Sequence, residues 1–154
     1  MHDTQTMAGT LTLILHDASG RVAARREVHN LVTQAGRELV AALFAGRRVG
    51  AIKARLVVGT EGKPPSVEDD RLTGEIDGVD LAESSVQVEG ARVTLTGRLP
   101  EREAGQPLRE AGIQIAVGAD RPVLYNRVVF EVVNKAPNMQ MTLTWSVNFG
   151  EGGK

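Results

Sequence analysis

Two charged residues lie within otherwise apolar strand-like segments: Glu110, which precedes Ala111-Gly112, and Arg127. If the turn between the segments centres between positions 119 and 120, position 110 pairs with 129. Position 110 is then a diagonal neighbour of 127 on the same face, within reach of long side chains. A carboxylate beside a guanidinium can do acid–base chemistry, but a structural ion pair is the commoner arrangement. We therefore expect Glu110 and Arg127 to form a structural ion pair.

Three consecutive acids, Glu68, Asp69 and Asp70, could supply oxygen ligands to calcium. Their spacing matches no defined calcium loop, and Arg71 follows them directly. A polar loop with local ion pairing fits the same residues better. The sequence therefore predicts no metal site here.

The remaining candidates for chemistry do not converge. His2, His16 and His29 lie apart in the expected hairpin, whereas zinc requires three or four converging ligands. The stretch 59–63 is similar to part of a phosphate loop, but Pro64 follows the lysine where a Ser or Thr is required. No serine has a well-placed base, and the chain has no cysteine. We expect no catalytic residue, no cofactor and no enzyme activity.

Composition limits the class of partner. The chain has 154 residues, one domain's worth, and a net charge of −1 with its cations spread along the sequence. No basic footprint for nucleic acid or an anionic membrane is present, no apolar run is long enough to cross a bilayer, and the N-terminus does not resemble a secretory signal. These features favour a soluble protein made in the cytoplasm, with protein partners.

The elements that must position these residues are mostly strands, and the last is the clearest. From Met139 to Phe149, apolar residues alternate strictly with polar ones, and the apolar set includes the only tryptophan, Trp145. Because side chains on a strand alternate between two faces, this segment buries one face and exposes Thr142 and Thr144 on the other. It is predicted to be a core strand of an antiparallel sheet.

The first half of the chain predicts an N-terminal hairpin, with strands near 11–15 and 22–28. A short amphipathic helix then runs from about Val32 to Gly46, capped by Thr33 or Asn30, with Phe44 on its apolar face. A strand follows from Ile52 and stops at Gly59. The segments 59–70 and 100–107 are predicted to be surface loops.

The second half predicts a hairpin over 86–99 with Glu89-Gly90 as its loop and Val86 opposite Val93. A strand over 113–117 then turns at 118–121. On the return strand the residues expected to face inward are Leu124, Val128, Phe130 and Val132, which leaves Tyr125 as the one aromatic residue outside the core.

The fold class expected is mainly β: an antiparallel β-sandwich with one short amphipathic α-helix and an N-terminal β-hairpin. Residues 10–149 form a single domain, between a flexible N-terminus at 1–9 and a flexible C-terminus at 150–154.

The order of these pieces resembles that of small structural proteins of phage tails and tail-like contractile injection particles. The motifs that carry the resemblance are Asn30 to Gly36 with the helix ending at Gly46, Leu56-Val57-Val58-Gly59-Thr60, Asp70-Arg71-Leu72, Leu108 to Ile113, Leu124 to Phe130 with Lys135, and Leu143 to Phe149. Together they cover roughly residues 27 to 149.

The resemblance implies a fibre, collar or baseplate-associated component that works by assembly. It implies a homo-oligomer that contacts other structural proteins of the particle and ends up in a virion or tail-like particle. The residues expected to serve structure or interfaces are Asn30, Gly36, Gly59, Thr60, Leu72, Glu110, Gly112, Arg127, Thr142, Thr144 and Trp145.

A lectin-like or calcium-dependent recognition domain is the alternative. Aromatic residues make up only 3% of the chain, which disfavours a sugar site built on exposed aromatic platforms. A small polar lectin site remains open. An enzyme ranks third, because it would need a concave site that gathers Glu110 or Asp70 with other titratable groups.

Overall fold

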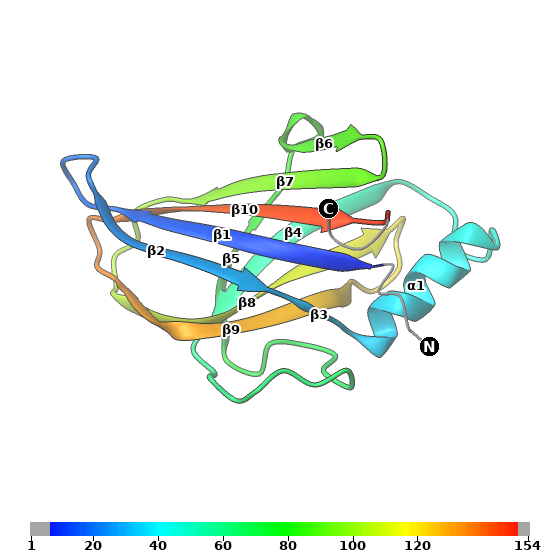
Figure 1. The fold of residues 1–154 in the computed structure, drawn as a ribbon, viewed down its shortest axis with the longest axis horizontal. Coiled ribbons are helices and arrows are strands. Elements are labelled where there is room, and N and C mark those ends of the chain that lie inside the picture. The colour runs from blue at the N-terminus through cyan, green and yellow to red at the C-terminus, as the bar shows by residue number, and fades with distance from the viewer. Residues whose placement is uncertain (1–6, 151–154) are drawn as a thin grey trace.

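The computed structural model describes residues 7–150. It consists of two five-stranded antiparallel sheets packed face to face and one α-helix, which confirms the predicted β-sandwich (Figure 1). Sheet A has the strand order β2-β1-β10-β7-β6, and sheet B has the order β3-β9-β8-β4-β5. In chain order the elements are β1 (Ala8–His16), β2 (Val22–His29), β3 (Leu31–Val32), α1 (Gln34–Phe44), β4 (Ile52–Gly59), β5 (Glu75–Asp80), the 3-10 helix η1 (Glu83–Ser85), β6 (Val86–Glu89), β7 (Arg92–Leu99), β8 (Gln106–Val117), β9 (Val123–Lys135) and β10 (Gln140–Asn148).

The predicted N-terminal hairpin is present as β1 and β2. The first strand begins at Ala8, inside the segment expected to be flexible, because Ala8 already pairs with Asn148 of β10. The remaining parts of the two predicted flexible ends, residues 1–6 and 151–154, lie outside the described residues.

Strand β10 lies in the middle of sheet A, between β1 and β7, and its alternation is as predicted. Met141, Leu143 and Trp145 are fully buried, while the intervening side chains are partly exposed. The two ends of the predicted apolar face do not follow the prediction. Met139 and Phe149 fall outside the strand, and Phe149 is 42% exposed because the chain leaves the sheet at Asn148.

The hairpin of β6 and β7 has a different register from the one predicted. Val86 lies opposite Leu95, not opposite Val93. The two loop residues are Gly90 and Ala91, since Glu89 pairs with Arg92. Gly90 has a φ of +61°, so glycine occupies the first loop position, as in a type II′ turn. The prediction placed it at the second position, which shifted the pairing.

Strand β5 was not predicted from the sequence. It pairs with β4 at the edge of sheet B, so that Leu56 lies opposite Val79. Its residues, Glu-Ile-Asp-Gly-Val-Asp, carry three acids and a glycine and give no clear alternation. The surface loop predicted over 59–70 therefore continues to position 74 before this strand begins.

Strands β8 and β9 form the long hairpin of sheet B, and Glu110 lies opposite Val129 as predicted. Two register shifts interrupt the pairing, one near each end. At both shifts β9 has more residues than β8, and the set of β9 side chains that faces inward changes there. Val133 is buried in place of Val132, and Leu124 packs in a small separate cluster outside the main core.

Tyr125 is buried in the main core, where the prediction left it outside. It is the residue skipped by the register shift, because Asn126 pairs with Ile113 while Leu124 pairs with Gln114. Its side chain is 6% exposed, and burial raises the pKa of its hydroxyl to about 12.

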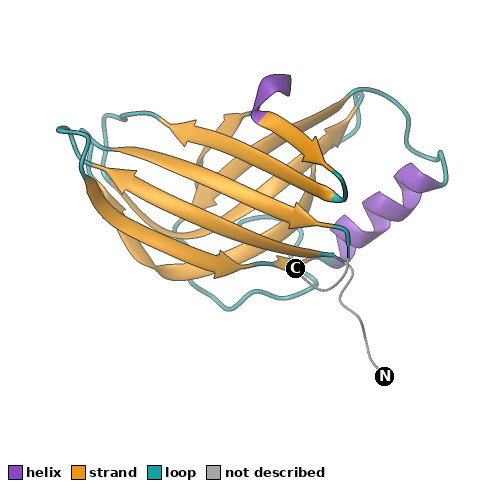
Figure 2. Ribbon diagram, turned by 45° about the horizontal axis from the view of Figure 1, so that its top comes forward, coloured by secondary structure: helices purple, strands orange, loops and turns teal. Residues whose placement is uncertain are grey.

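Helix α1 lies at one end of the sandwich and packs against β9 (Figure 2). Thr33 is its N-cap, since the Thr33 hydroxyl accepts a hydrogen bond from the Gly36 amide, and Gly46 follows its end with a φ of +71°. Phe44 is 94% exposed, so the expectation that it lies on the apolar face was wrong. At 100° per residue it lies about 140° around the helix from the buried Leu39.

Candidate functional site

Glu110 and Arg127 form a buried ion pair on the face of sheet B that points away from sheet A. The Glu110 side chain is fully buried and Arg127 is 3% exposed. The Arg127 Nε atom donates to Glu110 Oε1 at 3.0 Å, which confirms the contact expected from the strand register. Buried charges require such pairing because desolvation of a lone charge is costly.

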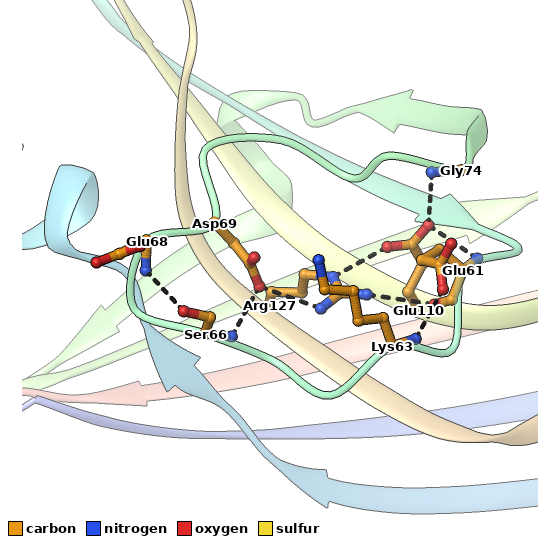
Figure 3. Close-up of polar contacts among 8 residues, drawn as sticks. All are labelled: Glu61, Lys63, Ser66, Glu68, Asp69, Gly74, Glu110 and Arg127. Carbon is orange, nitrogen blue, oxygen red and sulfur yellow. Dashed lines mark hydrogen bonds and ion pairs between the residues drawn. The ribbon is translucent and has the colours of Figure 1, made fainter.

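The loop between β4 and β5 closes over this pair (Figure 3). The second carboxylate oxygen of Glu110 accepts hydrogen bonds from the amides of Glu61, at 3.1 Å, and Gly74, at 3.0 Å. Arg127 donates through Nη1 to Asp69 at 3.1 Å and through Nη2 to the Glu61 carbonyl at 3.3 Å. One ion pair therefore holds both ends and the middle of the 60–74 loop.

Gly59 and Thr60 complete the anchor at the start of this loop. The Thr60 amide donates to the Gly74 carbonyl at 3.0 Å, which brings the two ends of the loop side by side. A Cβ atom at Gly59 would come to 2.6 Å from the Gly74 carbonyl oxygen and closer still to the Glu110 carboxylate. Only glycine at position 59 leaves room for the Glu110 carboxylate. Gly59 and Thr60 together therefore close the base of the loop.

Leu72 and Gly112 border the same cluster. Leu72 is 3% exposed and packs with Val57 and Leu124 in the small apolar cluster beneath the loop. Gly112 lies directly opposite Arg127 in the β8–β9 ladder. The apolar contact and the ion pair therefore seat neighbouring parts of the loop on sheet B.

The charged groups of the cluster are all hydrogen-bonded within the protein. Both Glu110 oxygens accept hydrogen bonds from within the protein, and each Arg127 nitrogen donates to an internal acceptor. Asp69 is shared between Arg127 and the Ser66 amide. In residues 7–150, no group of three or more His, Asp or Glu side chains is placed to hold a metal ion.

Asn30 and Trp145 meet in a second polar network, between the sheets. The Asn30 Oδ1 atom accepts hydrogen bonds from Trp145 Nε1 at 2.8 Å and from Asn126 Nδ2 at 2.9 Å. Asn126 in turn accepts from the Ile113 amide at 2.9 Å. A buried indole N–H requires such a partner. Asn30 thus links β10 of sheet A to β9 of sheet B.

Gly36 places the helix on sheet B. The Thr33 hydroxyl caps the helix and also donates to the Leu124 carbonyl at 2.6 Å. A Cβ atom at Gly36 would come to 2.9 Å from the Tyr125 Cα atom and nearer to its carbonyl oxygen. Glycine therefore allows α1 to lie directly on the β9 backbone.

Thr142 and Thr144 lie apart from both networks, on the outer face of sheet A. Thr144 has Thr12 and Thr96 as its cross-strand neighbours, and Ser146 has Thr10 and Thr94. We call Thr10, Thr12, Thr94, Thr96, Thr144 and Ser146 the hydroxyl face. All six are at least partly exposed. Thr142 lies beside it, between Ile14 and Arg98.

A third polar cluster, around Asp77, was not predicted from the sequence. Arg102 donates to both carboxylate oxygens of Asp77, at 2.8 and 2.9 Å, and Gln106 donates to one of them at 2.9 Å. Burial raises the pKa of Asp77, but the hydrogen bonds from Arg102 and Gln106 outweigh it and hold the pKa below its usual value. Nearby, the buried Lys135 donates to the Pro100 carbonyl at 2.7 Å.

The hydroxyl face has a signal in the sequence that no single strand reveals. The tripeptide Thr-Leu-Thr occurs at 10–12, at 94–96 and at 142–144. The strand order that places these three segments side by side is not encoded in any of them. The Asp77 cluster had no comparable signal, because it joins an edge strand to a distant loop.

No helix in the described part of the chain is long and apolar enough to span a membrane. Comparison with known proteins gives no relative from which a role could be carried over to these networks. No protein-family model, no curated protein sequence and no solved structure matches this chain.

Proposed function

We propose that this chain is a non-enzymatic structural component of a phage tail or tail-like particle, associated with its fibre, collar or baseplate. It acts by self-assembly and by contacts with other proteins of the particle. The observation that supports this proposal best is that its buried ion pair anchors a surface loop. Glu110 and Arg127 are the strongest candidates for chemistry in the sequence, and their hydrogen bonds shape the 60–74 loop.

A building block needs surfaces of fixed shape, and two are available. The 60–74 loop is exposed at its tip but anchored at its ends and its middle. The hydroxyl face is broad, regular and uncharged, and its short side chains lose little conformational entropy when a partner covers them. Both surfaces suit polar contacts between proteins.

Mass measurement by light scattering across a concentration series tests the proposal. We expect the purified chain to form a closed oligomer. A chain that stays monomeric at every concentration would contradict the proposal. The same samples can be titrated with calcium: a clear rise in melting temperature would favour the calcium-dependent recognition domain, because a ligand that binds only the native state stabilises it.

A further inference from the structure

An apolar cavity of about 1060 Å³ opens at the end of the sandwich that carries α1. Its walls come from both sheets and from the helix, among them Leu43, Ala54, Val93 and Ile115. Ile52 lies in its lining and is 58% exposed. A volume of this size, lined mainly by apolar side chains, is large enough to receive several side chains or a ligand.

The same end of the molecule carries the two most exposed large hydrophobic side chains in residues 7–150. Phe44, the last residue of α1, is 94% exposed, and Val49, in the connection to β4, is 82% exposed. Leu43 faces the cavity, and Phe44 points about 100° away from it around the helix. Phe44 therefore cannot enter the cavity of its own chain without unwinding the helix.

One acid of the cavity lining is left for a cation of a second copy. Arg47 is exposed between Phe44 and Val49. The lining carries Lys53 and Arg55 as well as the exposed Asp80 and Glu83, and Arg55 pairs with Asp80 at 2.9 Å. A second copy that presents Phe44 to the cavity would bring its Arg47 toward Glu83, the acid that does not pair with Arg55.

We infer that Phe44 and Val49 of one copy dock into the cavity of a second copy. The inference rests on the proposed function and deepens it, because it names the partner and the contact of self-assembly. Phe44 ends α1, and α1 also lines the cavity, so both features lie at the end of the sandwich where α1 is seen in Figure 1. Two copies that meet at these ends can each supply a side chain and a cavity. Burial of an aromatic side chain in a fitted pocket is the usual centre of such an interface.

The test compares the self-association of four chains by light scattering or sedimentation over a concentration series. Phe44→Ser removes the docking side chain, and Ile52→Glu places a charge at the cavity. Val22→Ser is the matched control, because Val22 is 59% exposed at the start of β2 and does not line the cavity. All three positions are exposed, so we expect each variant to keep the fold. Melting temperatures measured at low protein concentration and equal to that of the wild type would confirm this.

We expect the dissociation constant for self-association to rise at least about tenfold for Phe44→Ser and for Ile52→Glu, and to stay unchanged for Val22→Ser. An equimolar mixture of Phe44→Ser and Ile52→Glu should associate more tightly than either alone, because one intact side chain then meets one intact cavity.

A wild-type oligomer that neither substitution weakens would overturn the inference and leave the proposed function standing. A wild type that stays monomeric would remove both. If that monomer also binds the apolar dye anilinonaphthalene sulfonate, and Ile52→Glu abolishes this binding, the cavity serves a small apolar ligand.

Discussion

Two buried charged side chains in this protein each contact several partners. Glu110 has one oxygen on Arg127 and the other on two backbone amides, while Arg127 reaches Asp69 and a carbonyl as well. In such a cluster the net gain from each contact is modest, because desolvation offsets it. Removing one partner is strongly destabilising, since the others are then left buried without a counter-charge.

Replacing Arg127 with Met should lower the free energy of unfolding by about 3–5 kcal/mol, because Glu110 and Asp69 lose their counter-charge. Urea unfolding measures this change. Arg55→Met is the control, since Arg55 pairs with an Asp80 side chain that is 85% exposed, and its loss should cost less than about 1 kcal/mol. Equal losses in the two variants would contradict a special role for the buried cluster.

Tyr125 allows a direct test of its burial, because it is the only tyrosine in the chain. Ultraviolet absorbance of tyrosinate should titrate with a midpoint of about 12 in the folded protein. The same titration in denaturant should have its midpoint at the ordinary pKa of 10.0. Because the folded pKa is the higher one, Tyr125 contributes stability that is fully present below pH 10 and is lost as the pH rises toward 12. A folded midpoint near 10 would show that the hydroxyl is hydrated.

Among the secondary-structure elements, those with a strong local signal could be predicted and those defined by distant partners could not. The alternation of Met141, Leu143 and Trp145 predicted β10. The predicted pairing of Glu110 with Val129 is also correct, but only because the register shift at Tyr125 offsets a turn that lies earlier than predicted, with Ile115 opposite Val123. The polar edge strand β5 has no such pattern. The bond between Asn30 and Trp145 joins residues 115 positions apart, so only the assembled sandwich brings them together.

The first turn of α1 depends on a single side chain. Thr33→Ala should lower the free energy of unfolding by about 1–2 kcal/mol, because the Gly36 amide loses its acceptor and the Leu124 carbonyl loses a donor. Chemical denaturation measures the loss, and Thr33→Ser should restore most of it. Thr73→Ala, at an exposed position of the 60–74 loop, should change the stability by less than about 0.5 kcal/mol. A loss for Thr33→Ala no larger than this would contradict the capping role.

The whole molecule has one main core to which both sheets contribute. Leu11, Leu143 and Trp145 of sheet A belong to the same buried cluster as Leu56 and Ile113 of sheet B. Neither sheet can keep its apolar face covered without the other. The two sheets should therefore form and dissolve together.

Unfolding should be a single cooperative transition. Trp145, the only tryptophan, is fully buried between the sheets, so its fluorescence reports their separation. Far-ultraviolet circular dichroism reports the strands. In a urea titration, at a protein concentration that keeps the chain in one association state, we expect the two midpoints to coincide. Separate midpoints would show that one sheet survives without the other.

The closed base of the 60–74 loop has a consequence for how such a protein can diversify. Its ends are joined by Glu110 and by the Thr60–Gly74 hydrogen bond, while positions 62–65 at the tip are exposed. Doubling the length of a flexible loop costs only about 0.6 kcal/mol. The tip can therefore accept foreign peptides or accumulate mutations with little penalty to folding, so the sandwich can serve as a display scaffold whose specificity evolves separately from its stability.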